Sequence, residues 1–166
     1  MSALKALQTW DKPVRSPKIF LSVVIIGISL SLYLIYFHYE ARAGLPSWCN
    51  LNDKINCTNT ILSSYSEIGG MPLGVLGVVW FFISGLLYQN KLKFSGTGTN
   101  LPFYLFIWAG IGVVFAGYLV YIELFAVGSI CLLCTAAHVT GITIFVLSYL
   151  AVRGNLSKYM RNIFYK

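Results

Sequence analysis

The stretch Gly-Ser-Ile-Cys-Leu-Leu-Cys at residues 128–134 separates the last two apolar runs of the sequence. It places Cys131 and Cys134 three residues apart at the start of a helix, so both sulfurs share one face and can bond to each other. Free N–H groups and the positive dipole end stabilise a thiolate at such a terminus, and Ser129 is the expected N-cap. The spacing therefore predicts a reactive cysteine pair at the beginning of the last helix.

The composition excludes an ordinary soluble domain. Hydrophobic residues make up 57% of the 166 residues and charged residues only 10%, whereas soluble domains carry about 25% charged residues. The net charge of +7 does not indicate nucleic-acid binding, because the basic residues cluster at the ends of the apolar runs. We therefore expect an all-α integral membrane protein.

Four apolar runs predict a bundle of four transmembrane helices, at residues 19–37, 73–88, 101–127 and 131–152. At 1.5 Å per residue, the first run matches a hydrocarbon core of about 30 Å. A cleaved signal peptide is the alternative for this run, since Ala41-Arg42-Ala43 fits a small-x-small cleavage pattern. The run is longer and more aromatic than such a signal, which favours a membrane helix.

The long polar connection at residues 38–70 carries Cys49 and Cys57. Apolar residues recur at helical spacing in its second half, at Ile61, Leu62, Tyr65 and Ile68. Part of this connection is therefore expected to fold back as an amphipathic cap on the bundle.

The positions of Lys and Arg predict the orientation in the membrane. Ten of them lie at residues 1–18, in the connection after the second run, and at residues 153–166, whereas the cysteine side carries only Arg42 and Lys54. By the positive-inside rule, 1–18 and 153–166 are cytoplasmic segments that flank a membrane domain at 19–152. All four cysteines then face the outer, oxidising side of a cell membrane, where disulfides persist.

Small residues at helical spacing predict close helix packing. Gly74-x-x-Gly77 and Gly112-x-x-x-Ala116 are spacings that let membrane helices approach each other. The ordinary abundance of glycine in membrane helices is an equally good explanation for either pattern.

The four cysteines also permit other roles. A non-catalytic four-span membrane protein would use Cys49 and Cys57 to staple its outer loop. Such a protein has little use for Cys131 and Cys134, because a bridge between them closes almost no loop. A zinc site usually draws on two closely spaced pairs, and this sequence has one.

A redox role gives each pair a separate task. Cys49 and Cys57, on an aqueous loop, are open to a soluble dithiol protein. Cys131 and Cys134, at the membrane edge, are open to a molecule dissolved in lipid. Thiolate attack on one disulfide passes the oxidation state to the other through a mixed disulfide.

Three titratable residues accompany the cysteines. His138 lies one turn beyond Cys134 on the same face, where it can bond a ligand or, equally well, a backbone carbonyl of the bundle. Glu123 is the only acid within an apolar run; a proton relay is possible, but we expect it to reach the interface. His38, at the outer end of the first run, is also expected at the interface.

The sequence resembles the vitamin K epoxide reductase (VKOR) family, in its short prokaryotic form without a fused thioredoxin-like domain. The resemblance covers residues 18–152 and rests on Trp48-Cys49, Cys57, Ser63-Ser64-Tyr65, the segment Gly70-Met71-Pro72-Leu73-Gly74-Val75-Leu76-Gly77, and Cys131-Leu132-Leu133-Cys134.

This resemblance implies a quinone-dependent membrane thiol oxidoreductase that generates disulfides, with the outer loop as a lid over the bundle. Electrons would pass from a separate thioredoxin-like or DsbA-like dithiol protein to Cys49 and Cys57. They would continue to Cys131 and Cys134, and then to a lipid quinone of the ubiquinone or menaquinone type. Cys49 would meet the partner, and Cys57 would attack Cys131.

The resemblance also implies the quinone contacts, namely Cys134, His138 and Ser66. His138 stands where the vertebrate enzymes carry a tyrosine near the quinone head group. This difference favours a simple quinone over an epoxide as the substrate.

Overall fold

A computed structural model of the chain describes residues 17–45, 47–93 and 101–153. The predicted cytoplasmic segments at 1–18 and 153–166 lie almost wholly outside the described residues, and so does the glycine-rich connection after the second apolar run.

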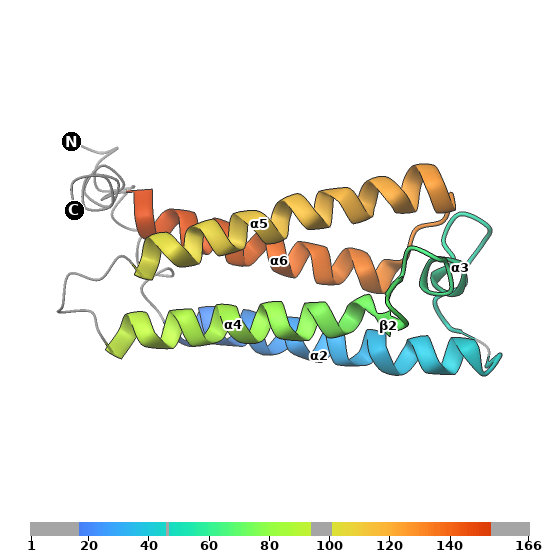
Figure 1. Ribbon diagram of the computed structural model, residues 1–166, viewed down its shortest axis with the longest axis horizontal. Helices are drawn as coiled ribbons and strands as arrows, with labels where there is room; N and C mark the ends of the chain where they lie inside the picture. The colour runs from blue at the N-terminus through green and yellow to red at the C-terminus, as the bar shows by residue number, and fades with distance from the viewer. Residues whose placement is uncertain (1–16, 46, 94–100, 154–166) are drawn as a thin grey trace.

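Four long helices run side by side through the described part of the chain (Figure 1). They are α2 (Pro17–Arg42), α4 (Leu73–Lys93), α5 (Leu101–Ile122) and α6 (Leu132–Val152). Their sequences are apolar on all sides, as expected of helices whose outer face meets lipid. The prediction of a bundle built from long apolar helices is confirmed.

Three helical segments of the described residues are long and apolar enough to cross a membrane, at Lys18–Arg42, Leu101–Val127 and Leu132–Val152. The apolar part of α4, Leu73–Gln89, is shorter. The number of membrane crossings therefore stays a prediction.

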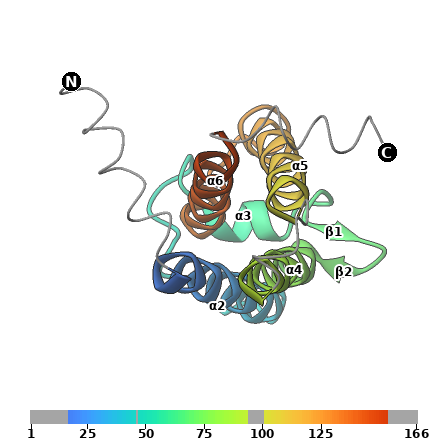
Figure 2. The same cartoon turned by 90° about the vertical axis from the view of Figure 1, so that its left-hand side faces the viewer.

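The helices form a ring in the order α2, α4, α5, α6 when viewed along the bundle (Figure 2). On α4, Gly74 and Gly77 lie directly against Ser31 of α2. A Cβ added at Gly74 would stand 2.9 Å from the Ser31 carbonyl oxygen, and a Cβ added at Gly77 would stand 2.6 Å from the Ser31 Oγ. The predicted close packing at this glycine pair is confirmed. On α5, Gly112 lies against the ring of Trp80 from α4.

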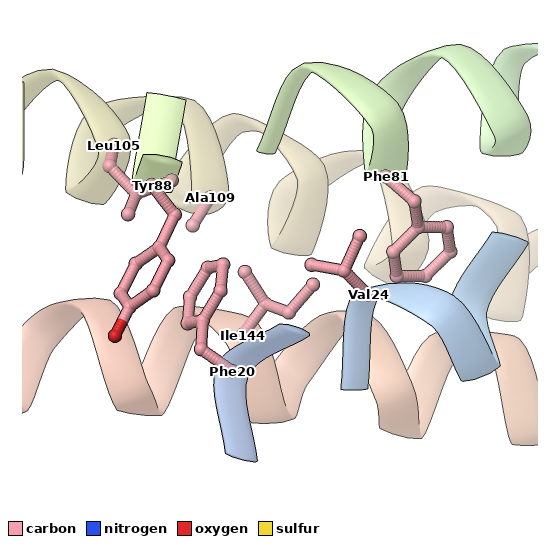
Figure 3. Packing of buried hydrophobic residues seen from close by; sticks show 7 residues of the cluster. All are labelled: Phe20, Val24, Phe81, Tyr88, Leu105, Ala109 and Ile144. Carbon is pink, nitrogen blue, oxygen red and sulfur yellow. The ribbon is translucent and has the colours of Figure 1, made fainter. Parts of the chain in front are cut away.

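A core of large side chains fills one half of the bundle (Figure 3). All of the long helices contribute to it, through Phe20, Val24, Phe81, Tyr88, Leu105, Ala109 and Ile144. The rings of Phe20 and Tyr88 stack with their centroids 4.0 Å apart. Lipid is as apolar as these side chains, so close packing, more than the hydrophobic effect, holds the helices together here.

The connection between α2 and α4 covers the other end of the bundle. It contains the short helix α3 (Cys57–Ile61) and a hairpin of β1 (Glu67–Ile68) and β2 (Met71–Pro72). The hairpin turns through Gly69 and Gly70, whose φ angles of 59° and 80° require residues that tolerate the left-handed region. Figure 2 shows α3 lying across the end of the bundle.

The helix boundaries differ from the predicted ones at several ends; helix α4, for example, continues five residues beyond Tyr88 to Lys93. Helix α2 continues five residues beyond Phe37 to Arg42, so His38 belongs to a helix and not to the connection. Glu40, Ala41 and Arg42 are good helix formers, and the backbone adopts a left-handed turn at Gly44. Helix α6 begins at Leu132, one residue later than expected.

The cap is less helical than predicted. Helix α3 ends at Ile61, and both Tyr65 and Ile68 lie beyond it with exposed side chains. Leu62 closes α3 as its C-cap, and the chain then enters the hairpin instead of continuing the helix. The apolar spacing that predicted a longer helix also fits this bend followed by a short strand.

Candidate active site

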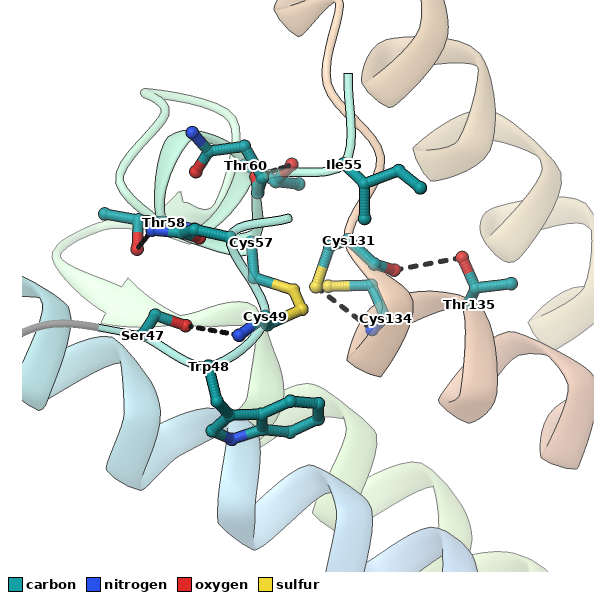
Figure 4. Close-up of a disulfide and its surroundings, with 12 residues drawn as sticks. Ser47, Trp48, Cys49, Ile55, Cys57, Thr58, Thr60, Cys131, Cys134 and Thr135 are labelled. Carbon is teal, nitrogen blue, oxygen red and sulfur yellow. Dashed lines mark hydrogen bonds between the residues drawn. A yellow bond between two sulfur atoms is a disulfide. The ribbon is translucent and has the colours of Figure 1, made fainter. Parts of the chain in front are cut away.

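Cys49 and Cys57 form a disulfide in the cap, with their Cα atoms 5.6 Å apart (Figure 4). Both cysteines are completely buried, in an apolar cluster that includes Phe37 and Ile61. In this structure neither sulfur is exposed to a soluble protein, so access of a partner to this pair stays a prediction. The residues on either side of Cys49 are exposed, and Trp48 has 63% of its surface accessible.

Cys131 and Cys134 are free thiols at the start of α6. Cys131 itself is the N-cap: its backbone is extended, and its sulfur accepts a hydrogen bond from the Cys134 N–H at 3.1 Å. The prediction of Ser129 as N-cap is wrong, because the Ser129 hydroxyl donates to the Asp53 carbonyl at 3.3 Å. Cys131 is buried, whereas Cys134 is half-buried.

The backbone of the cap pairs with the turn that precedes Cys131. The Ile130 N–H donates to the Lys54 carbonyl at 2.7 Å, and the Asn56 N–H donates to the Ile130 carbonyl at 3.2 Å. The Thr60 hydroxyl adds a bond to the Ser129 carbonyl at 3.1 Å. These bonds place Cys57, which follows Asn56, next to Cys131, which follows Ile130.

All four cysteines consequently belong to one apolar cluster, together with Leu133 and residues of α2. Figure 4 shows the disulfide and the free pair facing each other across the boundary between the cap and α6. This arrangement suits the transfer of a disulfide from one pair to the other by thiolate attack.

A cavity of about 430 Å³ lies inside the bundle beneath the cap, within the range typical of small-molecule sites. Its lining is largely apolar and comes from all of the long helices. The three predicted quinone contacts, Cys134, His138 and Ser66, all line it.

Two buried nitrogen atoms of the cavity wall lack a hydrogen-bond partner among the described residues, Nδ1 of His138 and Nε1 of Trp80. Buried polar atoms are nearly always paired in folded proteins, so unpaired ones in a cavity point to a polar ligand atom. The carbonyl oxygens of a quinone are hydrogen-bond acceptors, and they can pair with N–H groups at these positions. The cavity thus fits a quinone in size, in apolar character and in hydrogen bonding.

Ser66 shapes the cap. Its hydroxyl donates to the Ile61 carbonyl and to the Ser63 carbonyl, the latter at 2.8 Å. Its own carbonyl accepts from the Leu73 N–H at 2.9 Å, which ties the cap to the start of α4. In this arrangement the Ser66 hydroxyl offers no free hydrogen to a quinone carbonyl.

Glu123 is the site residue whose position the sequence did not reveal. We expected it at the interface, and this is wrong: only 6% of its surface is exposed, and it lines the cavity together with Cys134. Its carboxyl group lies close enough to the Cys131 backbone N–H and the Cys134 thiol to interact with both. A solitary acid in an apolar run, eight residues before Cys131, was the available signal.

The helical geometry changes at Glu123, at the end of α5. The α-helix gives way at Glu123 to the π-helical turn η1 (Glu123–Val127), which Gly128 closes with a φ of 71°. Single π-helical turns are frequent at functional sites.

An ion cluster ties the hairpin to α2. The Glu67 carboxylate of β1 lies 3.2 Å from His38 Nε2 and pairs with the Arg42 guanidinium. His38 is buried and lines the cavity, so the expectation of an interfacial position is wrong. This cluster links the hairpin of the cap to α2 beside the cavity.

Apolar helices, a buried disulfide and an adjacent free cysteine pair at an apolar cavity are the features of a membrane thiol oxidoreductase. The family model described as "Vitamin K epoxide reductase family" matches residues 18–149. The chain therefore belongs to the vitamin K epoxide reductase family. A comparison with curated proteins found no match.

Proposed function

We propose that this protein is a quinone-dependent thiol oxidoreductase that generates disulfides in a separate thioredoxin-like, DsbA-like protein. The observation that carries the proposal is the burial of the Cys49–Cys57 disulfide in the same apolar cluster as Cys131. Cys134, the partner of Cys131, lines the cavity. The two pairs thus connect the cap to the bundle interior.

The relay has two exchange steps. The dithiol of the partner protein reduces the Cys49–Cys57 disulfide and leaves as a disulfide. The Cys57 thiolate then attacks Cys131 in a Cys131–Cys134 disulfide, and Cys49 resolves the mixed disulfide. The pairing in the structure corresponds to the state after this step, with two electrons on Cys131 and Cys134.

The residues of the cavity wall would hold the quinone head group. His138 Nδ1 and Trp80 Nε1 are available to its carbonyl oxygens, and Cys134 provides the sulfur beside it. A lipid quinone of the ubiquinone or menaquinone type supplies a two-electron, two-proton acceptor that diffuses in the membrane. The apolar lining excludes water, which would otherwise compete for these hydrogen bonds.

The cap opens when the partner binds. The sulfur of Cys49 is buried in the closed cap, whereas Trp48 beside it is exposed. The Trp48 indole is held by a hydrogen bond from its Nε1 to the Tyr33 hydroxyl at 2.9 Å. A partner that displaces this indole uncovers Cys49.

The membrane domain at 19–152 would cross the cell membrane four times, with 1–18 and 153–166 in the cytoplasm. The start of α2 and the end of α6 lie at one end of the bundle and the cap at the other (Figure 1), in agreement with this count. Leu51→Cys, at an exposed cap position in a protein otherwise free of cysteine, tests the orientation. Labelling by an impermeant maleimide in intact cells is expected, and labelling only after lysis would contradict it.

Quinone reduction by the purified protein tests the function. Wild type is expected to turn over with a reduced DsbA-like donor and with dithiothreitol. Cys134→Ala should be inactive with either donor. Cys49→Ala should be inactive with the protein donor only, since dithiothreitol is small enough to bypass the cap cysteines. Thr143→Ala, on the same helix as Cys134 and outside the cavity, should match wild type.

A folded wild-type protein that reduces no quinone would contradict the proposal. A non-catalytic membrane protein with a stapled outer loop would then be the better account.

A further inference from the structure

We propose that Glu123 is the catalytic base that takes the proton of the Cys134 thiol and delivers it toward the quinone. This assignment rests on the proposed function and adds a catalytic residue to it.

The position of Glu123 is the first support. Its side chain is 6% exposed, at the end of a segment apolar enough to cross a membrane. It forms no ion pair with any residue that the structure describes. An ionisable group at membrane depth is costly, and it is retained where it lines an internal cavity or a proton path.

The contacts of Glu123 are the second support. Its carboxyl group lies close enough to the Cys134 thiol and to the Cys131 backbone N–H to interact with both. The same carboxyl group borders the cavity that Cys134 and His138 line. Glu123 therefore lies beside both the reacting sulfur and the space assigned to the quinone.

The chemistry needs such a group. When Cys131 and Cys134 form a disulfide, two S–H bonds break, one S–S bond forms, and two protons and two electrons leave the pair. They reduce one quinone to its hydroquinone, in which two O–H bonds form. Because the cavity is largely apolar, the protons need a carrier of the protein itself. Glu123 accepts the Cys134 proton as the S–H bond breaks, passes it on, and is unchanged at the end of the cycle.

A structural role is the competing explanation. The Glu123 carboxyl could serve only to accept the Cys131 N–H and so hold the start of α6. Glu123→Gln separates the two roles, because the amide oxygen of glutamine still accepts this hydrogen bond but the amide cannot take up a proton.

The test measures a single turnover. The protein is fully reduced in detergent and mixed with a short-chain ubiquinone, and the Cys131–Cys134 disulfide is counted by alkylation and mass spectrometry over time. Glu123→Gln is expected to react about 100-fold more slowly than wild type, since general acid–base catalysis contributes roughly 10²- to 10⁴-fold. Its affinity for the quinone and its melting temperature should stay close to those of wild type.

Glu40→Gln is the matched control. It makes the same substitution in α2, at a carboxylate that bonds the Tyr36 hydroxyl and does not line the cavity. It should react at the wild-type rate.

A rate for Glu123→Gln within twofold of wild type overturns the assignment. If Glu123→Gln does not fold, Glu123→Asp and Glu123→Asn decide: they have nearly the same shape, and only the first keeps a carboxyl group. Glu123→Asp should then react at least tenfold faster, and equal rates overturn the assignment. A wild type that binds the quinone but leaves both thiols reduced contradicts the proposed function itself, and the role of Glu123 with it.

Discussion

The Cys131 sulfur accepts a hydrogen bond from the Cys134 backbone N–H at 3.1 Å, so a member of the redox pair is also the N-cap of α6. A sulfur in this position receives an N–H donor and lies at the positive end of the helix dipole. The residue that the Cys57 thiolate is proposed to attack therefore also anchors the helix that carries Cys134. The Cys131 sulfur would thus take part in disulfide exchange and also cap α6.

Substitution of Cys131 should separate capping from chemistry. Cys131→Ser and Cys131→Ala both remove the thiol, so both should abolish turnover. A serine oxygen still caps α6, whereas an alanine cannot, and loss of an N-cap costs about 1 kcal/mol. Thermal unfolding in detergent should therefore rank Cys131→Ser above Cys131→Ala. Equal melting temperatures would mean that the sulfur contributes nothing as a cap.

Two glycines of α5 should respond differently to a methyl group. A Cβ at Gly112 overlaps the indole of Trp80, whereas a Cβ at Gly117 meets nothing within 4 Å. Gly112→Ala should lower the unfolding free energy by about 1–3 kcal/mol, the usual cost of overpacking. It should also weaken quinone binding, because Trp80 forms part of the cavity wall.

Gly117→Ala is the control for this effect, and its stability should equal or slightly exceed that of wild type. Equal stability of the two variants, measured by denaturant titration, would argue against the contact between Gly112 and Trp80.

The ion cluster should govern how often the cap opens. Glu67→Gln leaves the buried His38 without its carboxylate partner, so hydrogen exchange of the backbone at residues 60–72 should accelerate several-fold. Arg42→Ala should have a smaller effect, because its side chain is 53% exposed and exposed ion pairs contribute at most about 1 kcal/mol. Exchange rates of Glu67→Gln that match wild type would show that the cluster does not hold the cap.

His138 should contribute to quinone binding. His138→Leu keeps a side chain of similar bulk and removes the unpaired Nδ1 of the cavity wall. A net hydrogen bond contributes about 0.5–1.5 kcal/mol, so the quinone KM should rise roughly 2- to 13-fold. Thr140→Val is the control, since the Thr140 hydroxyl bonds the Ala136 carbonyl at 2.8 Å and is not in the cavity wall. An unchanged KM for His138→Leu would remove it from the quinone site.

The sequence alone was enough to predict the helices and the family. Runs of apolar residues report transfer into lipid, which is a local property, and glycine and polar residues mark where the runs are interrupted. The cysteine spacing placed a reactive pair at the start of the last helix. The motifs around Trp48, Gly70 and Cys131 led to the family that residues 18–149 match.

Only the tertiary structure showed which faces of the helices point into the bundle. A helix that is apolar on every side has no periodic signal to show which face meets its neighbours. For this reason Glu123 and His38 were expected at the interface, although both line the cavity.

The burial of the Cys49–Cys57 disulfide also depended on tertiary contacts. It results from backbone hydrogen bonds that Ile130 makes with Lys54 and Asn56, each more than 70 residues earlier in the sequence. Such bonds form between any residue types, so no pattern of side chains predicts them. The sequence determined which groups carry the chemistry, and the fold decided which of them meet.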